Sequence, residues 1–371
     1  MLPILNLKRE LEIKQFVLLE AFDNFLNDAN FILGNAVKAF ELWMSEQLLN
    51  REVISVANGS DAIQLALEAL ALNSNNNVIV PVNAGGYASI AARNINVQVV
   101  PVEICEGCGV MEIKDALLQV NSNTKAIVFP HLYGNVHDLR NLRMECDARG
   151  IFLIEDCAQV FGGFNGDSPA GTFGHLSTFS FYPTKNLGAF GDAGAISTAD
   201  VTLGRKIRNA RQYGWTDKYY ISQTFGKNSR MDELQARLLL VQKNYYLKEA
   251  EDRRNILKQL YNKHKSFTQI TRYELGNMAH LNVIKFLIPE MRNVAIEFLQ
   301  NSKIQTAIHY PIIDSEQIGL KNVSRRNLPK SRIWANSVLT IPLFSTMNSE
   351  EINLLKTSLL ELDQLLSETF L

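Results

Sequence analysis

Two residues in the middle of the chain, Asp156 and Lys185, have the types and the setting needed for chemistry on an aldehyde cofactor. Taken singly, each has a commoner structural meaning, because a strand-end aspartate usually caps a helix and a lone lysine is usually solvated. Pyridoxal 5'-phosphate (PLP) chemistry needs a lysine amine for a Schiff base, an acid for the pyridine nitrogen, and polar groups for the phenolic oxygen and the phosphate. In that order, the four tasks suit Lys185, Asp156, Gln159 and Ser180.

The element that must position the acid is a short apolar run at residues 151–154. Its length and composition predict a strand that is buried on both faces of a parallel sheet. Glu155 and Asp156 follow at once. Ligands of open α/β sheets bind beyond the carboxyl ends of the strands, so we expect a carboxylate at this point to face the binding crevice.

A second segment, residues 52–70, predicts a strand, a tight turn and a helix that begins near Ser60 or Asp61. Gly59 lets the backbone approach an anion closely, and the free N–H groups at the start of the helix favour negative charge. On its own, such an Asn-Gly-Ser-Asp run more often means a capped helix. Beside Lys185, it indicates a cup for the phosphate of the cofactor.

The remaining pattern predicts an α/β protein with two domains. Residues 9–47 show helical periodicity, further strands are expected at residues 77–82, 97–104, 126–131 and 193–198, and a long helix is expected to be capped by Asn228 or Ser229. From about residue 245 the pattern changes to strands at 282–287, 306–310 and 338–341 and helices at 249–264, 290–301 and 348–367. We therefore expect a large domain, residues 1–244, with a mostly parallel central sheet, and a smaller C-terminal α+β domain, residues 245–371.

Composition narrows the class of protein. A chain of 371 residues with 46% hydrophobic residues is typical of a soluble globular protein, and its net charge of −1 gives no field to attract nucleic acid or a membrane surface. Four cysteines in so long a chain, and no signal-peptide or membrane-spanning run, favour the cytoplasm. Cys105 and Cys108 form a C-x-x-C, but without a second pair an ordinary turn is favoured over a metal or redox site.

Three segments resemble the signature segments of a known family. They are EDCAQVFGG at residues 155–163, GTFGHLSTFSFYPTKNLGAFGDAGAIST at 171–198 and NSRMDELQA at 228–236. The similarity, which runs from Leu5 to near the C-terminus, is to the DegT/DnrJ/EryC1/StrS aminotransferases, fold-type I PLP-dependent enzymes (aspartate aminotransferase-like) that act on nucleotide-linked keto-sugars.

The resemblance implies further contacts with the cofactor. It places the phosphate on Gly59 and Ser60 and an aromatic ring, here Tyr87, against the pyridine ring. An asparagine at the position of Asn228 reaches the phosphate of the other subunit, which implies a homodimer with both sites at the interface. Ordinary packing of Tyr87, and a helix cap at Asn228, are the alternatives. His131, in a family-like H-L-Y-G loop, is expected to flank the cofactor, since Lys185 can carry protons itself.

The substrate side is also implied by the resemblance. His309 and Tyr310 belong to a turn similar to the one that faces the substrate in the family, although a buried strand-end pair is the alternative. Tyr182 is placed near the reacting carbon, and Lys218 and Arg230 are the local cations for a diphosphate.

Two loops indicate which carbon of the sugar receives the amino group. After Pro311 the chain lacks the proline-rich form common in enzymes that aminate C-4, and its NAGGY loop is more similar to enzymes that aminate C-3. The resemblance thus implies transfer from L-glutamate, which leaves as 2-oxoglutarate, to C-3 of a dTDP-linked 3-keto-6-deoxyhexose, by way of pyridoxamine 5'-phosphate. The alternatives are C-4 amination of a 4-keto-6-deoxyhexose, a PLP-dependent sugar dehydratase (whose relatives replace the lysine), and a non-enzymatic regulator, for which no basic stripe is visible.

Overall fold

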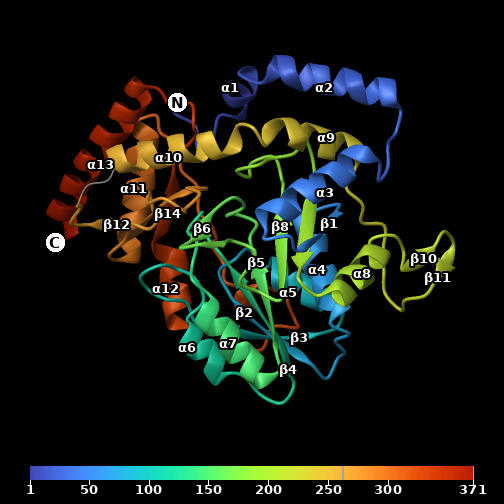
Figure 1. The fold of residues 1–371 in the computed structure, drawn as a ribbon. Helices are drawn as coiled ribbons and strands as arrows, with labels where there is room; N and C mark the ends of the chain where they lie inside the picture. Colours follow the sequence, from blue (N-terminus) through green and yellow to red (C-terminus); the bar gives the residue numbers. More distant parts are fainter. Residues whose placement is uncertain (261–262, 371) are drawn as a thin grey trace.

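The computed structural model describes residues 1–260 and 263–370 and is built around one large sheet (Figure 1). The seven strands lie in the order β1-β9-β8-β5-β4-β2-β3. Their bounds are β1 (Glu52–Val56), β2 (Asn77–Pro81), β3 (Gln98–Val102), β4 (Thr124–Pro130), β5 (Phe152–Asp156), β8 (Leu176–Ser180) and β9 (Gly194–Thr198). β9 pairs antiparallel with β1 and β8, and the other four pairs are parallel. The predicted mostly parallel α/β sheet is confirmed.

Helices cover both faces of this sheet because alternate strand residues point to opposite sides. Val53 belongs to one buried core and Ile54 to the other. The first core includes residues of α3 (Asn35–Gln47), α6 (Ile113–Leu118), α7 (Arg140–Arg149) and α9 (Glu233–Gln242). The second includes residues of α4 (Gly59–Ala69), α5 (Tyr87–Asn94) and α8 (Val201–Ala210).

A smaller sheet lies in the C-terminal part of the chain. Its antiparallel strands are β12 (Phe267–Gln269), β13 (Asn282–Phe286) and β14 (Val338–Ile341). A separate core joins them to α10 (Tyr246–Leu260), α11 (Pro289–Asn301) and α13 (Ser349–Phe370).

Contacts cross the predicted division at residues 244 and 245 in both directions. Leu2 joins the core of the small sheet and pairs with Ile304 in a parallel bridge. In return, Val323 pairs with Val99 of the large sheet, and the segment from the 3-10 helix η1 (Asp314–Glu316) to α12 (Pro329–Ser337) packs beside it.

The remaining elements belong to neither of these two sheets. They are α1 (Leu7–Glu12), α2 (Gln15–Asp28), and two short hairpins, β6 (Phe164–Asn165) with β7 (Ser168–Pro169) and β10 (Trp215–Asp217) with β11 (Tyr220–Ile221). The β10–β11 hairpin projects from the body of the molecule (Figure 1). Among the described residues, no helix is both long enough and apolar enough to span a bilayer.

Two local predictions were wrong. The strand expected at residues 306–310 is reduced to a single bridge between Ala307 and Thr340, because the chain then leaves the sheet for the cavity described below. The helix expected to be capped at Asn228 or Ser229 begins at Glu233, and the Ser229 hydroxyl instead accepts a hydrogen bond from the backbone N–H of Ala57 at 3.2 Å.

Candidate active site

A cavity of about 370 Å³ lies beyond the carboxyl ends of β5 and β8 and against the first turn of α4. Its lining includes Gly59, Ser60, Tyr87, Asp156, Gln159, Ser180, Tyr182, Lys185, His309 and Tyr310, all of them site residues proposed from the sequence. Lys218, Asn228 and Arg230 do not line it. The fold therefore brings together residues from both halves of the chain, while the individual roles remain predictions.

The two adjacent acids take different directions. Asp156, the last residue of β5, faces the cavity, and its carboxylate accepts a hydrogen bond from the N–H of Ala158 at 3.0 Å. Burial raises the pKa of Asp156, while that backbone bond and the charge of Lys185 oppose the rise. An acid so placed, next to a cavity and little screened by water, can form a strong bond with a protonated ring nitrogen.

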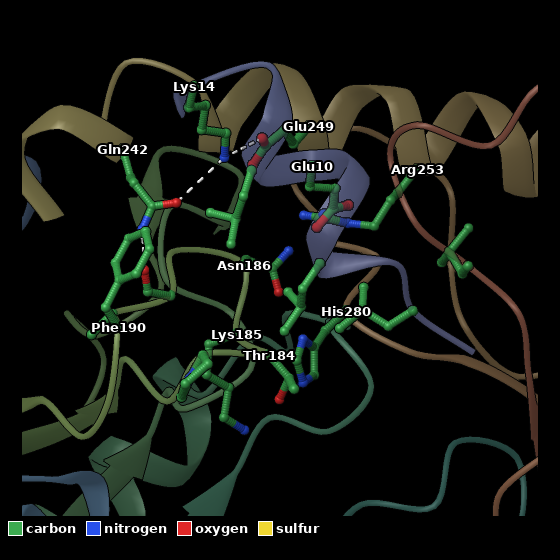
Figure 2. Close-up of a pocket in the computed structure, with 17 residues that line it drawn as sticks. Glu10, Lys14, Thr184, Lys185, Asn186, Phe190, Gln242, Glu249, Arg253 and His280 are labelled. Atoms are coloured by element: carbon green, nitrogen blue, oxygen red, sulfur yellow. Dashed lines mark hydrogen bonds and ion pairs between the residues drawn. The ribbon is translucent and has the colours of Figure 1, made fainter. Parts of the chain in front are cut away.

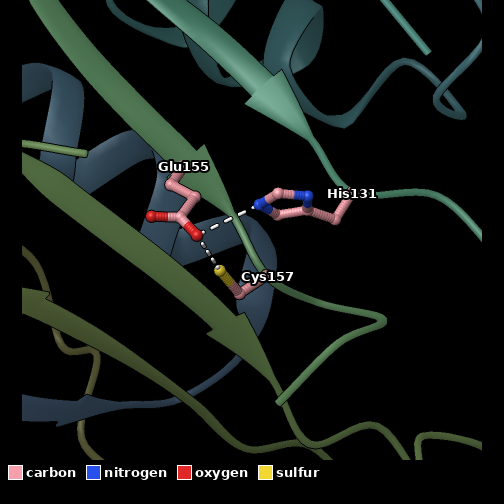
Figure 3. Close-up of side chains that lie close together, drawn as sticks. All are labelled: His131, Glu155 and Cys157. Atoms are coloured by element: carbon pink, nitrogen blue, oxygen red, sulfur yellow. Dashed lines mark hydrogen bonds and ion pairs between the residues drawn. The ribbon is translucent and has the colours of Figure 1, made fainter. Parts of the chain in front are cut away.

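Glu155 instead is fully buried beside His131 and Cys157 (Figure 3), and it does not line the cavity. Its carboxylate accepts hydrogen bonds from the N–H groups of Gly171 at 2.6 Å, and of Phe173 and Gly174 at 3.0 Å each. Because successive strand residues point to opposite sides, Asp156 faces the cavity, as expected of a carboxylate at this point, and Glu155 faces away from it.

His131 and Cys157 are held by the same buried carboxylate (Figure 3). The Nε2 atom of His131 lies 3.0 Å from Glu155 Oε1, and Nδ1 accepts the N–H of His137 at 3.2 Å. Burial and the neighbouring Glu155 and Asp156 charges raise the pKa of the Cys157 thiol. These three side chains could be mistaken for a metal site, but the glutamate oxygens are already taken by N–H donors and the thiol stays protonated.

Lys185 lies in a tight loop after β8 and reaches into the cavity. Its N–H bonds to the carbonyl oxygen of Tyr182 at 2.8 Å, and a Cβ at Gly188 would lie 2.4 Å from the carbonyl oxygen of Pro183, so the loop accepts only glycine there. Burial lowers the pKa of Lys185, and Asp156 partly restores it. A lowered pKa leaves more of the amine unprotonated, the form that attacks a carbonyl carbon.

The first turn of α4 forms a cradle for an anion. The Asn58 side chain caps the N–H of Asp61 at 2.7 Å, which leaves the N–H groups of Gly59 and Ser60 without intrahelical acceptors. A Cβ on Gly59 would lie 2.7 Å from the Cβ of Ser180, so a side chain here would fill the space between α4 and β8. This geometry fits the phosphate of PLP.

Gln159 is held firmly at the cavity wall. Its Oε1 accepts the N–H of Tyr133 at 2.5 Å, and its Nε2 donates to the hydroxyl of Tyr310 at 3.0 Å. An amide nitrogen has two donors, so one remains for the phenolic oxygen of the cofactor. Burial raises the pKa of Tyr310, which keeps this hydroxyl protonated.

Thr178 and His280 are among the polar residues that line the cavity but were not proposed from the sequence. The buried hydroxyl of Thr178, on β8, has no hydrogen-bond partner among the described residues and is available to the phosphate. Burial and the Lys185 charge lower the pKa of His280, so its ring is neutral near pH 7. Thr178 could have been predicted, because it lies two residues before Ser180 and so on the same face of the strand. No feature of the sequence near His280 indicates that it lines the cavity.

His280 and Lys185 also line a second cavity of about 110 Å³ (Figure 2). Charged residues of α1 and α10 close its far side, where Lys14 pairs with Glu249 and donates to Gln242 at 3.4 Å.

The sheet, the lysine loop, the acid and the anion cradle together define a PLP-dependent enzyme of fold type I. Comparison with known proteins agrees. The model of the DegT/DnrJ/EryC1/StrS aminotransferase family matches residues 14–359. The chain is 31% identical to the UDP-N-acetyl-3-dehydro-alpha-D-glucosamine 3-aminotransferase of Acidithiobacillus ferrooxidans, over 95% of each chain. It is 32% identical to the dTDP-3-amino-3,6-dideoxy-alpha-D-galactopyranose transaminase of Aneurinibacillus thermoaerophilus, over 95% of this chain and 97% of the other.

Among solved structures, S. venezuelae DesV in complex with a ketimine intermediate superposes with a TM-score of 0.91 at 27% identity, over 98% of each chain. The chain belongs to the DegT/DnrJ/EryC1/StrS aminotransferase family. It is a PLP-dependent sugar-nucleotide aminotransferase.

Proposed function

We propose that the enzyme transfers the amino group of L-glutamate to C-3 of a dTDP-linked 3-keto-6-deoxyhexose, giving a dTDP-3-amino-3,6-dideoxyhexose. The observation that carries the transaminase chemistry is that Lys185 and Asp156 face one cavity beside an anion cradle. The position of the nitrogen is supported by the two full-length relatives named above, since both names place it at C-3. The four free thiols support a cytoplasmic setting.

PLP, when bound, supplies an aldehyde carbon for the amino group and a ring that accepts negative charge from the reacting carbon. The chain supplies the rest. Asp156 keeps the ring nitrogen protonated, the α4 cradle and Ser180 hold the phosphate, and Gln159 donates to the phenolic oxygen. Lys185 Nζ would hold the aldehyde carbon of the cofactor and, once free, would carry the proton to or from the substrate carbon.

The proposed homodimer follows from charge. The cofactor phosphate, the sugar diphosphate and the glutamate carboxylates are all anionic, yet Lys185 is the only lysine or arginine among the described residues that line the cavity. Further cations must therefore approach from outside. Lys218, in the turn of the projecting β10–β11 hairpin, is exposed, as is Asn228, and Arg230 is half-buried against the ring of Tyr213. We propose that Lys218, Asn228 and Arg230 complete the site of a second copy.

Apolar side chains on α2 support the same proposal. Phe16, Leu19, Phe22 and Leu26 are all exposed, and part of this face borders an open apolar groove next to Phe190. A contiguous apolar surface of this kind is typical of a protein–protein interface. A second copy would cover it.

Turnover with L-glutamate and a panel of nucleotide-linked 3-keto and 4-keto sugars tests the reaction. We expect the dTDP-linked 3-keto sugar to be used and NMR of the product to show nitrogen on C-3. Nitrogen on C-4 would establish the alternative C-4 aminotransferase, and PLP binding without transfer to any sugar would indicate a non-enzymatic role.

Mixing two inactive variants tests the shared site. If Asn228 acts on the other subunit, dimers of Lys185→Ala with Asn228→Ala contain one intact site, and random mixing restores about a quarter of all sites. If Asn228 acts only within its own chain, mixing restores none. Each variant alone, exchanged in the same way, is the control.

A further inference from the structure

Asp314 is a buried carboxylate outside the cofactor machinery. It is 3% exposed and begins the short helix η1, four residues after Tyr310. Its N–H donates to the carbonyl oxygen of Val82 at 2.9 Å, and its Oδ2 accepts the hydroxyl of Ser89 at 2.5 Å. Burying a carboxylate costs free energy, and a single side-chain hydrogen bond offsets only part of that cost. We therefore infer that the position of this side chain matters.

That hydrogen bond joins the two segments that carry aromatic rings into the cavity. Ser89 lies on α5, two residues after Tyr87, and Asp314 follows Tyr310 on the segment that comes from the small sheet. Both rings line the cavity. They meet at Gly85, where a Cβ would lie 2.8 Å from Tyr87 Cε2 and 2.9 Å from Tyr310 Cε1.

The two segments that the Ser89–Asp314 hydrogen bond joins are each held in place by a further hydrogen bond. Ser89 is fully buried, and its carbonyl oxygen accepts a hydrogen bond from Asn322 Nδ2 at 3.0 Å. At the other end, Tyr310 is held by Gln159. The space between Asp314, Tyr87 and Asp156 is a void of about 10 Å³, which admits at most one water molecule. A change at Asp314 therefore reaches the cavity through packing and not through a ligand bound there.

We propose that Asp314 is a positioning residue for the sugar side of the reaction, and that its bond to Ser89 sets the separation of the Tyr87 and Tyr310 rings. This inference rests on the proposed function, because it takes the Tyr310 ring, which this bond spaces from the cofactor-facing Tyr87 ring, as the wall against which the sugar lies. L-Glutamate has no sugar ring and does not need that wall. Loss of the bond should weaken sugar recognition and leave the amino-donor reaction unchanged.

The test compares two amines that both convert the PLP form of the enzyme to its pyridoxamine form. One is L-glutamate and the other is the dTDP-3-amino-3,6-dideoxyhexose, and absorbance follows both half-reactions from the same starting enzyme. In Asp314→Ala we expect the half-saturating concentration of the amino sugar to rise about tenfold, the effect of one buried hydrogen bond, and that of L-glutamate to change less than about twofold.

Two further variants separate positioning from general damage. Asp314→Asn keeps an oxygen that accepts the Ser89 hydroxyl and should stay near wild type, while Ser89→Ala should match Asp314→Ala. Ser331→Ala is the matched control, because it removes a bond from a buried serine to the Glu103 carboxylate, at 2.7 Å, in a residue that does not line the cavity.

Equal loss for both amines in Asp314→Ala, or no change for the amino sugar, would overturn the inference. Loss in Asp314→Asn as large as in Asp314→Ala would also contradict it. Failure of the proposed function looks different, because wild-type enzyme would then react with L-glutamate and not with the C-3 amino sugar. In that case the same comparison is made with the amino sugar that wild-type enzyme does accept.

Discussion

Removing the Glu155 carboxylate should cost the protein a large part of its stability. In Glu155→Ala, three buried backbone N–H groups, those of Gly171, Phe173 and Gly174, lose their acceptor. Each unpaired buried donor costs about 1 to 3 kcal/mol. Arg51, which donates to the carbonyl oxygens of Gly171 and Gly174, also loses a nearby counter-charge. The three unpaired donors alone therefore predict a loss of at least about 3 kcal/mol.

Chemical denaturation with PLP removed measures this change directly. The midpoint should fall while the slope of the transition stays constant, which would show that stability and not the unfolded state has changed. Glu155→Gln keeps one acceptor oxygen and should lose about half as much. A loss below about 1 kcal/mol in Glu155→Ala would refute the reasoning, because the three donors would then have found other partners or water.

Three other predictions concern the site and its surroundings. Asp156→Ala should still bind PLP through Lys185 and the cradle but lose roughly a thousandfold or more in transfer rate, since the ring nitrogen loses its acid; near-normal single-turnover rates would remove Asp156 from the mechanism. Lys185→Ala should abolish the cofactor–peptide bond that borohydride traps in wild-type enzyme, and mass mapping shows whether another residue is labelled. Burial raises the pKa of Asp314 to about 7 from its ordinary value of 3.8, so the native state holds this proton more tightly than the unfolded chain does. Stability from this group is present at low pH and is lost as the pH rises through about 7. Asp314→Asn should remove that part of the pH dependence between melts at pH 5 and pH 8, and an unchanged difference would contradict the assignment.

Short-range patterns were sufficient to predict two of the elements that line the candidate site. The apolar run before Asp156 is β5, and the Asn-Gly-Ser-Asp turn is the start of α4. In both places a polar residue at the end of an element also lines the cavity. One local pattern therefore predicts both the element and the location of a site residue. The side to which Glu155 points depends on which face of β5 is turned toward the cavity. The apolar run alone does not contain that information.

Contacts between distant residues could not be predicted in this way. The hydrogen bond from Gln159 to Tyr310 spans 151 residues, and the one from Ser89 to Asp314 spans 225. Both bonds depend on the path of the segment after residue 306 as it leaves the small sheet. The composition of that segment predicts a strand and gives no sign of this path. His280 faces the cavity for the same reason, since only the packed arrangement brings it beside Lys185.

The bridge between Leu2 and Ile304 has a consequence for synthesis of the protein. Leu2 donates its N–H to the carbonyl oxygen of Lys303 at 2.7 Å and accepts the N–H of Gln305 at 2.9 Å. The backbone of Leu2 therefore cannot form these hydrogen bonds until residues 303–305, far along the chain, have been translated. The bridge closes a loop of about 300 residues, so it is a contact of high sequence separation that forms late in folding.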